Sequence, residues 1–196
     1  MSSMTLAPTL VRPLVRRSAL ATEATLVLTG VALLAVSAQV VIPLWFTPVP
    51  LTGQTFAVLL VGGAYGAMRG MLTFALYLAV GAAGAPVFAE GASGWQALLG
   101  PTGGYLAGML VAVAIVGATA QRGWDRHVLP STVAMLAGNA VIYLFGLTWL
   151  GLYLGTGVAE TLALGAAPFV VGDLIKIALA AVALPTAWSV IGKLRS

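Results

Sequence analysis

The run GAAPFVVGDLIKIALAAVAL, residues 165–184, is apolar along almost its whole length but carries two charged side chains, Asp173 and Lys176. Its length and composition predict a transmembrane helix. An ionisable side chain near the centre of such a helix costs about 2.5–3.5 kcal/mol, so two of them require a physical explanation. Because the i, i+3 spacing places both on one helical face, they either hold one polar ligand together or form a structural ion pair that braces a helix bundle.

The composition of the whole chain indicates the class of protein. Hydrophobic residues make up 60% of the 196 residues and charged residues only 7%, and the mean hydropathy is +1.04. No soluble domain of this size needs so much apolar surface, so we expect an all-α, polytopic membrane protein. The sequence pI of about 9.9 does not indicate a nucleic-acid partner, because the basic residues are scattered between apolar runs.

Several kinds of chemistry are excluded by what the sequence lacks. It contains no cysteine for a thiolate metal site, and its five acidic residues form no carboxylate cluster for a metal. It has no Gly-x-x-x-x-Gly-Lys-[Ser/Thr] phosphate loop, so it is not itself an ATPase of that class. Ser93 lies in a Gly-x-Ser-Gly sequence, but the single histidine, His127, is predicted on the opposite face of the membrane. We therefore expect no enzyme, no cofactor and no metal site.

Apolar segments separated by Gly, Pro and polar residues predict about six transmembrane helices. We place them at Thr22–Ile42, Leu51–Ala67, Gly70–Ala85, Thr102–Ala120, Pro130–Tyr153 and Pro168–Ile191. Residues 1–21 are expected to be a cytoplasmic N-terminal segment, followed by a single six-helix substrate-binding domain over residues 22–196. The first apolar run is longer than the core of a signal peptide and lacks a clear cleavage motif, so we expect it to be retained.

The basic residues orient this bundle. They precede span one, separate spans two and three, separate spans four and five, and follow span six: Arg12, Arg16, Arg17, Arg69, Arg122, Arg126, Lys193 and Arg195. The other connections contain no Lys or Arg, so the positive-inside rule predicts that both termini are cytoplasmic. Asp173 then lies about 8 Å inward from the outer start of span six. The Asp173–Lys176 site is therefore expected to be reached from outside.

Further candidate ligand-binding residues lie at the same outer level. Thr52 and Gln54 offer neutral hydrogen-bonding groups where span two begins, although a plain loop and helix cap is an equal alternative. Tyr105 follows Gly103 and Gly104 at the start of span four, where the glycines alone favour close helix packing.

Polar and aromatic residues elsewhere complete the candidate set. Asn139 and Tyr143 are one turn apart in span five, and they either contact ligand or bond across helices. Trp95 belongs to an outer aromatic set with Trp45, Phe46 and Phe88, which either packs on a ligand or anchors the protein at the membrane interface.

Four segments resemble, in the right order, the signatures of the BioY family: AQVVIP (38–43), PVPLTGQT (48–55), GPTGGY (100–105) and PFVVGDLIK (168–176). The run YLFGLTWL (143–150) is similar as well, and the resemblance extends from about residue 24 to residue 184. It implies a six-helix substrate-capture (S) component of an energy-coupling factor transporter in the bacterial cytoplasmic (inner) membrane. Such a component binds biotin from the outer face and docks on a transmembrane coupling protein with cytoplasmic ATPases.

The resemblance also implies roles for the candidate residues. Asp173 would accept the ureido N–H groups of biotin, and Lys176 would donate to the ureido oxygen or to the carboxylate. Neutral groups would take the remaining polar atoms and aromatic rings would pack on the apolar rings, with Gln54, Thr52, Asn139, Tyr143, Tyr105 and Trp95 as candidates.

Three alternatives remain open at this point. The chain could be an S component for another vitamin, or a stand-alone secondary transporter or facilitator. It could also be a membrane enzyme or structural bundle in which Asp173–Lys176 is only an ion pair. The docking surface is open too, because the first span has no clear Ala-x-x-x-Ala pattern of the kind through which S components often dock.

Overall fold

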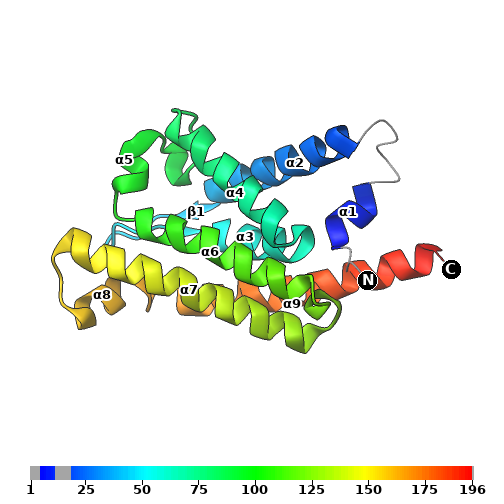
Figure 1. Cartoon of the computed structure of the whole chain (residues 1–196). Coiled ribbons are helices and arrows are strands. Elements are labelled where there is room, and N and C mark those ends of the chain that lie inside the picture. Colours follow the sequence, from blue (N-terminus) through cyan, green and yellow to red (C-terminus); the bar gives the residue numbers. More distant parts are fainter. Residues whose placement is uncertain (1–4, 12–18, 196) are drawn as a thin grey trace.

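The structure is a computed structural model that describes residues 5–11 and 19–195. Within these residues, a bundle of long helices is closed at one end by short helices and a β-hairpin (Figure 1). Helices α3 and α6 lie at the centre: α6 packs on α3, α4 and α7, and α3 also packs on α2 and α9. The long helices are α2 (Ala19–Gln39), α3 (Gln54–Tyr65), α4 (Ala67–Ala82), α6 (Gly103–Ala120), α7 (Val128–Leu154) and α9 (Val170–Arg195).

Membrane-spanning character divides these helices into two groups. Helices α2, α6, α7 and α9 are each long and apolar enough to cross a membrane. Helices α3 and α4 are apolar but shorter, at 12 and 16 residues. The all-helical membrane fold is therefore confirmed, whereas the count of six spans and the cytoplasmic position of both termini stay predictions.

Most observed helix boundaries differ from the predicted ones by one to four residues, and three differences stand out. Helix α2 ends at Gln39, short of the expected Ile42, because the chain turns there into a strand. The connection between the second and third expected spans is the single residue Gly66, since α4 begins at Ala67. Helix α9 begins at Val170 and continues through Pro185 to Arg195, four residues past the expected end.

Gly66 explains how α3 and α4 meet without a loop. Its φ of +81° belongs to a region that favours glycine, and it interrupts helical geometry for one residue. Gly117 of α6 lies against this break, where a Cβ atom would collide with the backbone of Gly66 and Ala67. Both short helices therefore pack closely on α6, where glycines let the backbones approach each other. Most residues of α3 are buried.

A small antiparallel hairpin connects α2 to α3. Strands β1 (Val41–Ile42) and β2 (Leu51–Thr52) pair Val41 with Thr52 and Ile42 with Leu51. The N–H of Gly53 donates to the carbonyl oxygen of Val40 at 2.9 Å and closes the base of the hairpin. This hairpin is the one departure from an all-helical structure among the described residues.

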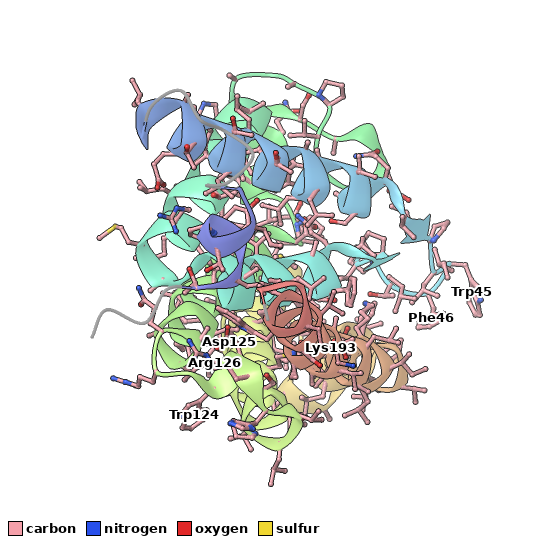
Figure 2. The ribbon with its side chains drawn as sticks, turned by 90° about the vertical axis from the view of Figure 1, so that its right-hand side faces the viewer. Trp45, Phe46, Trp124, Asp125, Arg126 and Lys193 are labelled. Atoms are coloured by element: carbon pink, nitrogen blue, oxygen red, sulfur yellow. The ribbon has the colours of Figure 1, made fainter. Side chains whose placement is uncertain are left out.

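Short elements complete both ends of the bundle: α1 (Leu6–Val11), η1 (Ala89–Gly91), α5 (Gly94–Leu99), η2 (Trp124–Arg126) and α8 (Val158–Gly165). Helix α1 lies within the segment expected to precede the bundle, and it packs on α2, α3 and α9. Its end of the bundle also carries the C-terminal part of α9 and the basic residues Arg126 and Lys193 (Figures 1 and 2). Arg12, Arg16 and Arg17 lie outside the described residues, so their share of the charge pattern stays a prediction.

Candidate functional site

A cavity opens at the hairpin end of the bundle, where α3, α6 and α9 begin. It holds about 640 Å³ of empty space, its mouth included. Side chains from the hairpin, the connection between α4 and α5, and the helices α3, α6, α7 and α9 with their flanking residues line it. The polar ones are Thr52, Gln54, Thr55, Thr102, Tyr105, Tyr143, Asp173 and Lys176, and the apolar ones are Val49, Pro50, Phe88, Ala89, Leu106, Met109, Ile142 and Phe169. Most of the surface area of the cavity wall is apolar and its charges are confined to α9, as is typical of small-molecule sites.

The charged part of the cavity is a hydrogen-bonded cluster around Asp173, which is only 5% exposed. Lys176 Nζ donates to Asp173 Oδ1 at 3.0 Å and to Thr55 Oγ1 at 3.0 Å. Thr55 Oγ1 also lies 3.3 Å from Asp173 Oδ1, and the Tyr143 hydroxyl donates to Asp173 Oδ2 at 2.6 Å. Three helices thus meet at one buried carboxylate.

The position of Asp173 in its helix favours its negative charge. It lies in the first turn of α9, and its own N–H donates to the carbonyl oxygen of Phe169 at 2.8 Å. The N-terminus of a helix carries partial positive charge, which stabilises a carboxylate there. The local sequence explains the position, since Pro168 just precedes the helix and cannot donate from its own nitrogen.

Phe88 reaches the cavity from the connection between α4 and α5. Its ring sits against Gly81, where a Cβ atom would collide with it, and it meets Tyr77 edge to face with ring centroids 5.4 Å apart. Gln39 Nε2 donates to the carbonyl oxygen of Phe88 at 3.0 Å, and the Tyr77 hydroxyl donates to the carbonyl oxygen of Val87 at 3.0 Å. This segment is thereby fixed as an apolar wall of the cavity.

Tyr105 and Gln54 line the cavity, but each has a bond to the protein itself. The Tyr105 hydroxyl donates to the carbonyl oxygen of Gly165 at 2.8 Å, which ties α6 to the end of α8. Gln54 Nε2 donates to the Tyr77 hydroxyl at 2.9 Å. Tyr105 therefore offers a ligand mainly its ring, in keeping with the expected packing role, and Gln54 offers mainly its amide oxygen.

Six of the eight residues proposed from the sequence line this cavity: Asp173, Lys176, Tyr143, Tyr105, Gln54 and Thr52. The other two lie elsewhere. Trp95 is on α5 and is 68% exposed, while Asn139 is buried on α7, one turn further from the cavity mouth than Tyr143, and its Oδ1 has no partner among the described residues. Their roles in binding stay predictions, and the geometry does not bring either one to the cavity wall.

Sequence reasoning did not select several cavity residues. Thr55 was inside the PVPLTGQT segment, and its place one residue after Gln54 was a usable signal. Phe88 belongs to the outer aromatic set for which ligand packing and interfacial anchoring were both open, and it is buried and lines the cavity. Met109 and Ile142 look like ordinary core residues in sequence, and only the packing of α6 on α7 reveals their position. No group of three His, Asp or Glu side chains that could hold a metal occurs in the described part of the chain.

The chain is similar in sequence to known proteins. The sequence profile described as "BioY family" matches residues 8–193. A "Probable biotin transporter BioY" of Pyrococcus horikoshii is 40% identical over 162 residues, covering 83% of this chain and 93% of the relative. A "Biotin transporter BioY" of Thermotoga maritima is 39% identical, covering 76% of this chain and 86% of the relative.

A solved structure shares the fold. It is the crystal structure of the S-component for biotin from an ECF-type ABC transporter. It superposes with a TM-score of 0.79 and 24% sequence identity, covering 86% of this chain and 92% of that one. The all-helical arrangement is therefore that of a known transporter subunit.

Proposed function

Because the chain belongs to the BioY family, we propose that it is a biotin-binding membrane subunit of an uptake transporter. Its relatives from Pyrococcus horikoshii and Thermotoga maritima are named as biotin transporters, and together with the fold they support a transport role and no catalytic one. The described helices support a multi-pass membrane protein. The bacterial cytoplasmic membrane is our proposed location.

The observation that carries the ligand assignment is the hydrogen-bonding capacity left at Asp173 and Lys176. A carboxylate offers about four acceptor positions and an ammonium group has three donors. Described residues fill three of the acceptor positions on Asp173 and two of the donors on Lys176. One acceptor position on Asp173 Oδ2 and one donor on Lys176 therefore remain, and both residues line the cavity. The ureido group of biotin presents an N–H beside a carbonyl oxygen, which complements this pair.

The rest of the cavity suits the rest of the ligand. Biotin has a fused thioether ring and a short aliphatic chain, both apolar. Phe88, Met109 and Ile142 supply apolar contacts from three different segments. Burial of apolar surface against such side chains contributes about 25 cal/mol per Å², so the wall adds affinity while the charged cluster selects the head group.

Titration of biotin into the purified full-length chain, followed by calorimetry, tests this proposal. We expect saturable binding that Asp173→Asn or Lys176→Met weakens strongly, with Lys193→Met at the far end of α9 as the matched control. Thiamine and riboflavin should not bind. Biotin-like binding of either of these vitamins, or wild-type biotin affinity in both site variants, would reject the assignment.

The position of the biotin carboxylate can be settled by the same assay. Biotin methyl ester lacks the anion but keeps the ureido ring. If Lys176 serves the ureido group, the ester binds almost as well as biotin and still requires Lys176. If Lys176 serves the carboxylate, the ester loses affinity and the Lys176→Met variant no longer distinguishes the two ligands.

We further propose that uptake depends on separate ATPase subunits and a transmembrane coupling protein. The chain's lack of a phosphate loop supports this division of labour. Accumulation of labelled biotin in cells that express the chain with and without those partners tests it. Uptake that is equal in both strains would instead identify a stand-alone transporter.

A further inference from the structure

The connection between α2 and α3 exposes two aromatic side chains at its tip. Trp45 is 96% exposed and Phe46 is 42% exposed. Their rings meet edge to face, with centroids 5.4 Å apart and planes at 82°. Figure 2 shows both side chains at the rim of the molecule, directed away from the bundle. Neither residue lines the cavity, so the function proposed above makes no use of them.

The surroundings of this tip are apolar. The sequence contains no charged residue between Glu23 and Arg69. The hairpin lies beside the start of α9, since Leu51 would be in van der Waals contact with a Cβ atom on Gly172. In this part of α9, Val171 and Leu174 are exposed. An apolar surface therefore continues from a membrane-spanning helix onto the hairpin.

The tip is also held in a fixed position. The Thr47 hydroxyl donates to the carbonyl oxygen of Leu164 at 2.9 Å, which ties the tip to the end of α8. The N–H of Thr47 bonds to the carbonyl oxygen of Leu44 at 3.3 Å, and the N–H of Val49 bonds to Thr47 Oγ1 at 3.3 Å. The two adjacent exposed rings of Trp45 and Phe46 and the exposed apolar side chains at the start of α9 form an apolar surface, and apolar patches of this kind mark protein or membrane interaction sites.

We propose that Trp45 and Phe46 form a membrane-interface anchor in the leaflet at the cavity end of the protein. An indole ring combines apolar area with one N–H donor, and such rings settle at the headgroup level of a bilayer. The indole N–H of Trp45 has no acceptor in the described part of the chain, so it can donate to a lipid carbonyl or phosphate. The segment that carries the tip has no charged residue from Ala24 to Met68, which favours this occupant over an acidic or basic protein partner.

This anchor has a consequence for the cavity. Val49 follows the tip by three residues, is buried, and lines the cavity together with Pro50. The hairpin therefore contacts the bilayer surface with one part and forms a cavity wall with the next. Lipid contact at the tip would hold that wall in place.

A site-specific fluorophore tests the anchor, because the chain has no cysteine and one substitution gives one label. Phe46→Cys in the full-length protein is labelled with a nitrobenzoxadiazole group and placed in phosphatidylcholine vesicles. Ala92→Cys is the matched control, since Ala92 is an exposed residue of the loop between η1 and α5 at the same end of the molecule. Quenching by aqueous iodide and by lipids with a nitroxide near the headgroup is measured for both labels.

The anchor predicts that the label at position 46 is shielded from iodide and quenched by the nitroxide lipid, and that the label at position 92 behaves in the opposite way. Equal iodide access at the two positions overturns the proposal. Shielding at position 46 that disappears when the protein is diluted into more lipid also overturns it, because contact with a second copy of the chain would then explain the shielding. None of these readouts depends on biotin, so they stand apart from the proposed function.

Discussion

The Tyr143 hydroxyl donates a hydrogen bond of 2.6 Å to Asp173 Oδ2 and joins α7 to the first turn of α9. This bond bridges two helices across the side of the cavity. Asp173 is buried, so its second carboxylate oxygen depends on Tyr143 for a donor among the described residues. The bond consequently holds the carboxylate in one orientation before any ligand arrives.

Tyr143→Phe should therefore destabilise the protein. Loss of the donor leaves a buried carboxylate oxygen unpaired, which costs about 1–3 kcal/mol. Thermal unfolding of the ligand-free protein in detergent measures the loss. Tyr153→Phe, a hydroxyl removal at an exposed position of the same helix, is the control and should leave the midpoint unchanged. An equal midpoint for Tyr143→Phe and Tyr153→Phe would contradict the expected role.

Paired substitution separates a binding site from an ion pair. Lys176→Met alone leaves Asp173 buried without its cation, and removing one partner of a buried pair destabilises by roughly 3–5 kcal/mol. Asp173→Leu combined with Lys176→Met removes both charges and should restore stability close to wild type. If the cluster binds ligand, the double variant folds but no longer binds biotin in calorimetry. A stable double variant that still binds would show that the pair is only structural.

Gly81→Ala should disturb the cavity through Phe88. The added methyl group would overlap with the Phe88 ring. Overpacking of this kind typically lowers the free energy of unfolding by about 1–3 kcal/mol. The Phe88 ring must then move out of its place in the cavity wall. A loss of about 1.4 kcal/mol in binding free energy lowers affinity tenfold, so we expect biotin affinity to fall roughly tenfold or more. Gly192→Ala is the matched helical control, because no atom lies near a Cβ at that position. Calorimetric titration compares the two variants.

The pH dependence of stability should carry a contribution from Asp125, in the connection between α6 and α7. Burial raises the pKa of this carboxyl above its ordinary value, although the bond from Trp188 and the charge of Arg126 oppose the shift. Trp188 Nε1 donates to Asp125 Oδ2 at 2.5 Å, and the Arg126 guanidinium lies over the Trp188 ring, 4.7 Å from its centroid. The native state therefore binds the proton more tightly than the unfolded chain does.

The direction of the effect follows from proton linkage. Between the ordinary pKa of the carboxyl and its raised native value, the native state holds more protons than the unfolded state, so the free energy of unfolding falls as pH rises. Asp125→Asn keeps an acceptor for Trp188 and should flatten this slope. Thermal midpoints measured from about pH 4 to about pH 7 test it, a range that starts near the ordinary pKa of an aspartate. Glu160→Gln removes a carboxyl at an exposed position of α8 and is the control variant.

The sequence predicts most of the polar residues that line the cavity, because two of them are ionisable side chains whose burial in a membrane helix costs free energy. Asp173 and Lys176 are conspicuous in an apolar run, and the charge pattern of the loops placed them near one end of the bundle. Gln54 followed from its polarity at the same level, and Tyr143 from its polarity in span five. These signals arise from single residues in their local context, so no tertiary information was needed.

The remaining parts of the site depend on tertiary packing. Phe88 turns inward because Gly81 leaves space for its ring, and the sequence around Phe88 does not reveal that space. The hairpin of β1 and β2 is two residues long on each side, too short for an alternating pattern to appear. Asn139 was expected either to contact ligand or to bond across helices, and the turn of helix that separates it from Tyr143 moves it about 5.4 Å along the axis.

Helix α3 runs from the cavity to the opposite end of the bundle. Its first residues, Gln54 and Thr55, line the cavity, and its last residue, Tyr65, accepts a hydrogen bond from Thr5 at the far end of the bundle. Twelve helical residues span only about 18 Å, against a hydrocarbon layer of about 30 Å. Along α3, the protein between the cavity and the far end of the bundle is therefore shorter than the hydrocarbon layer is thick.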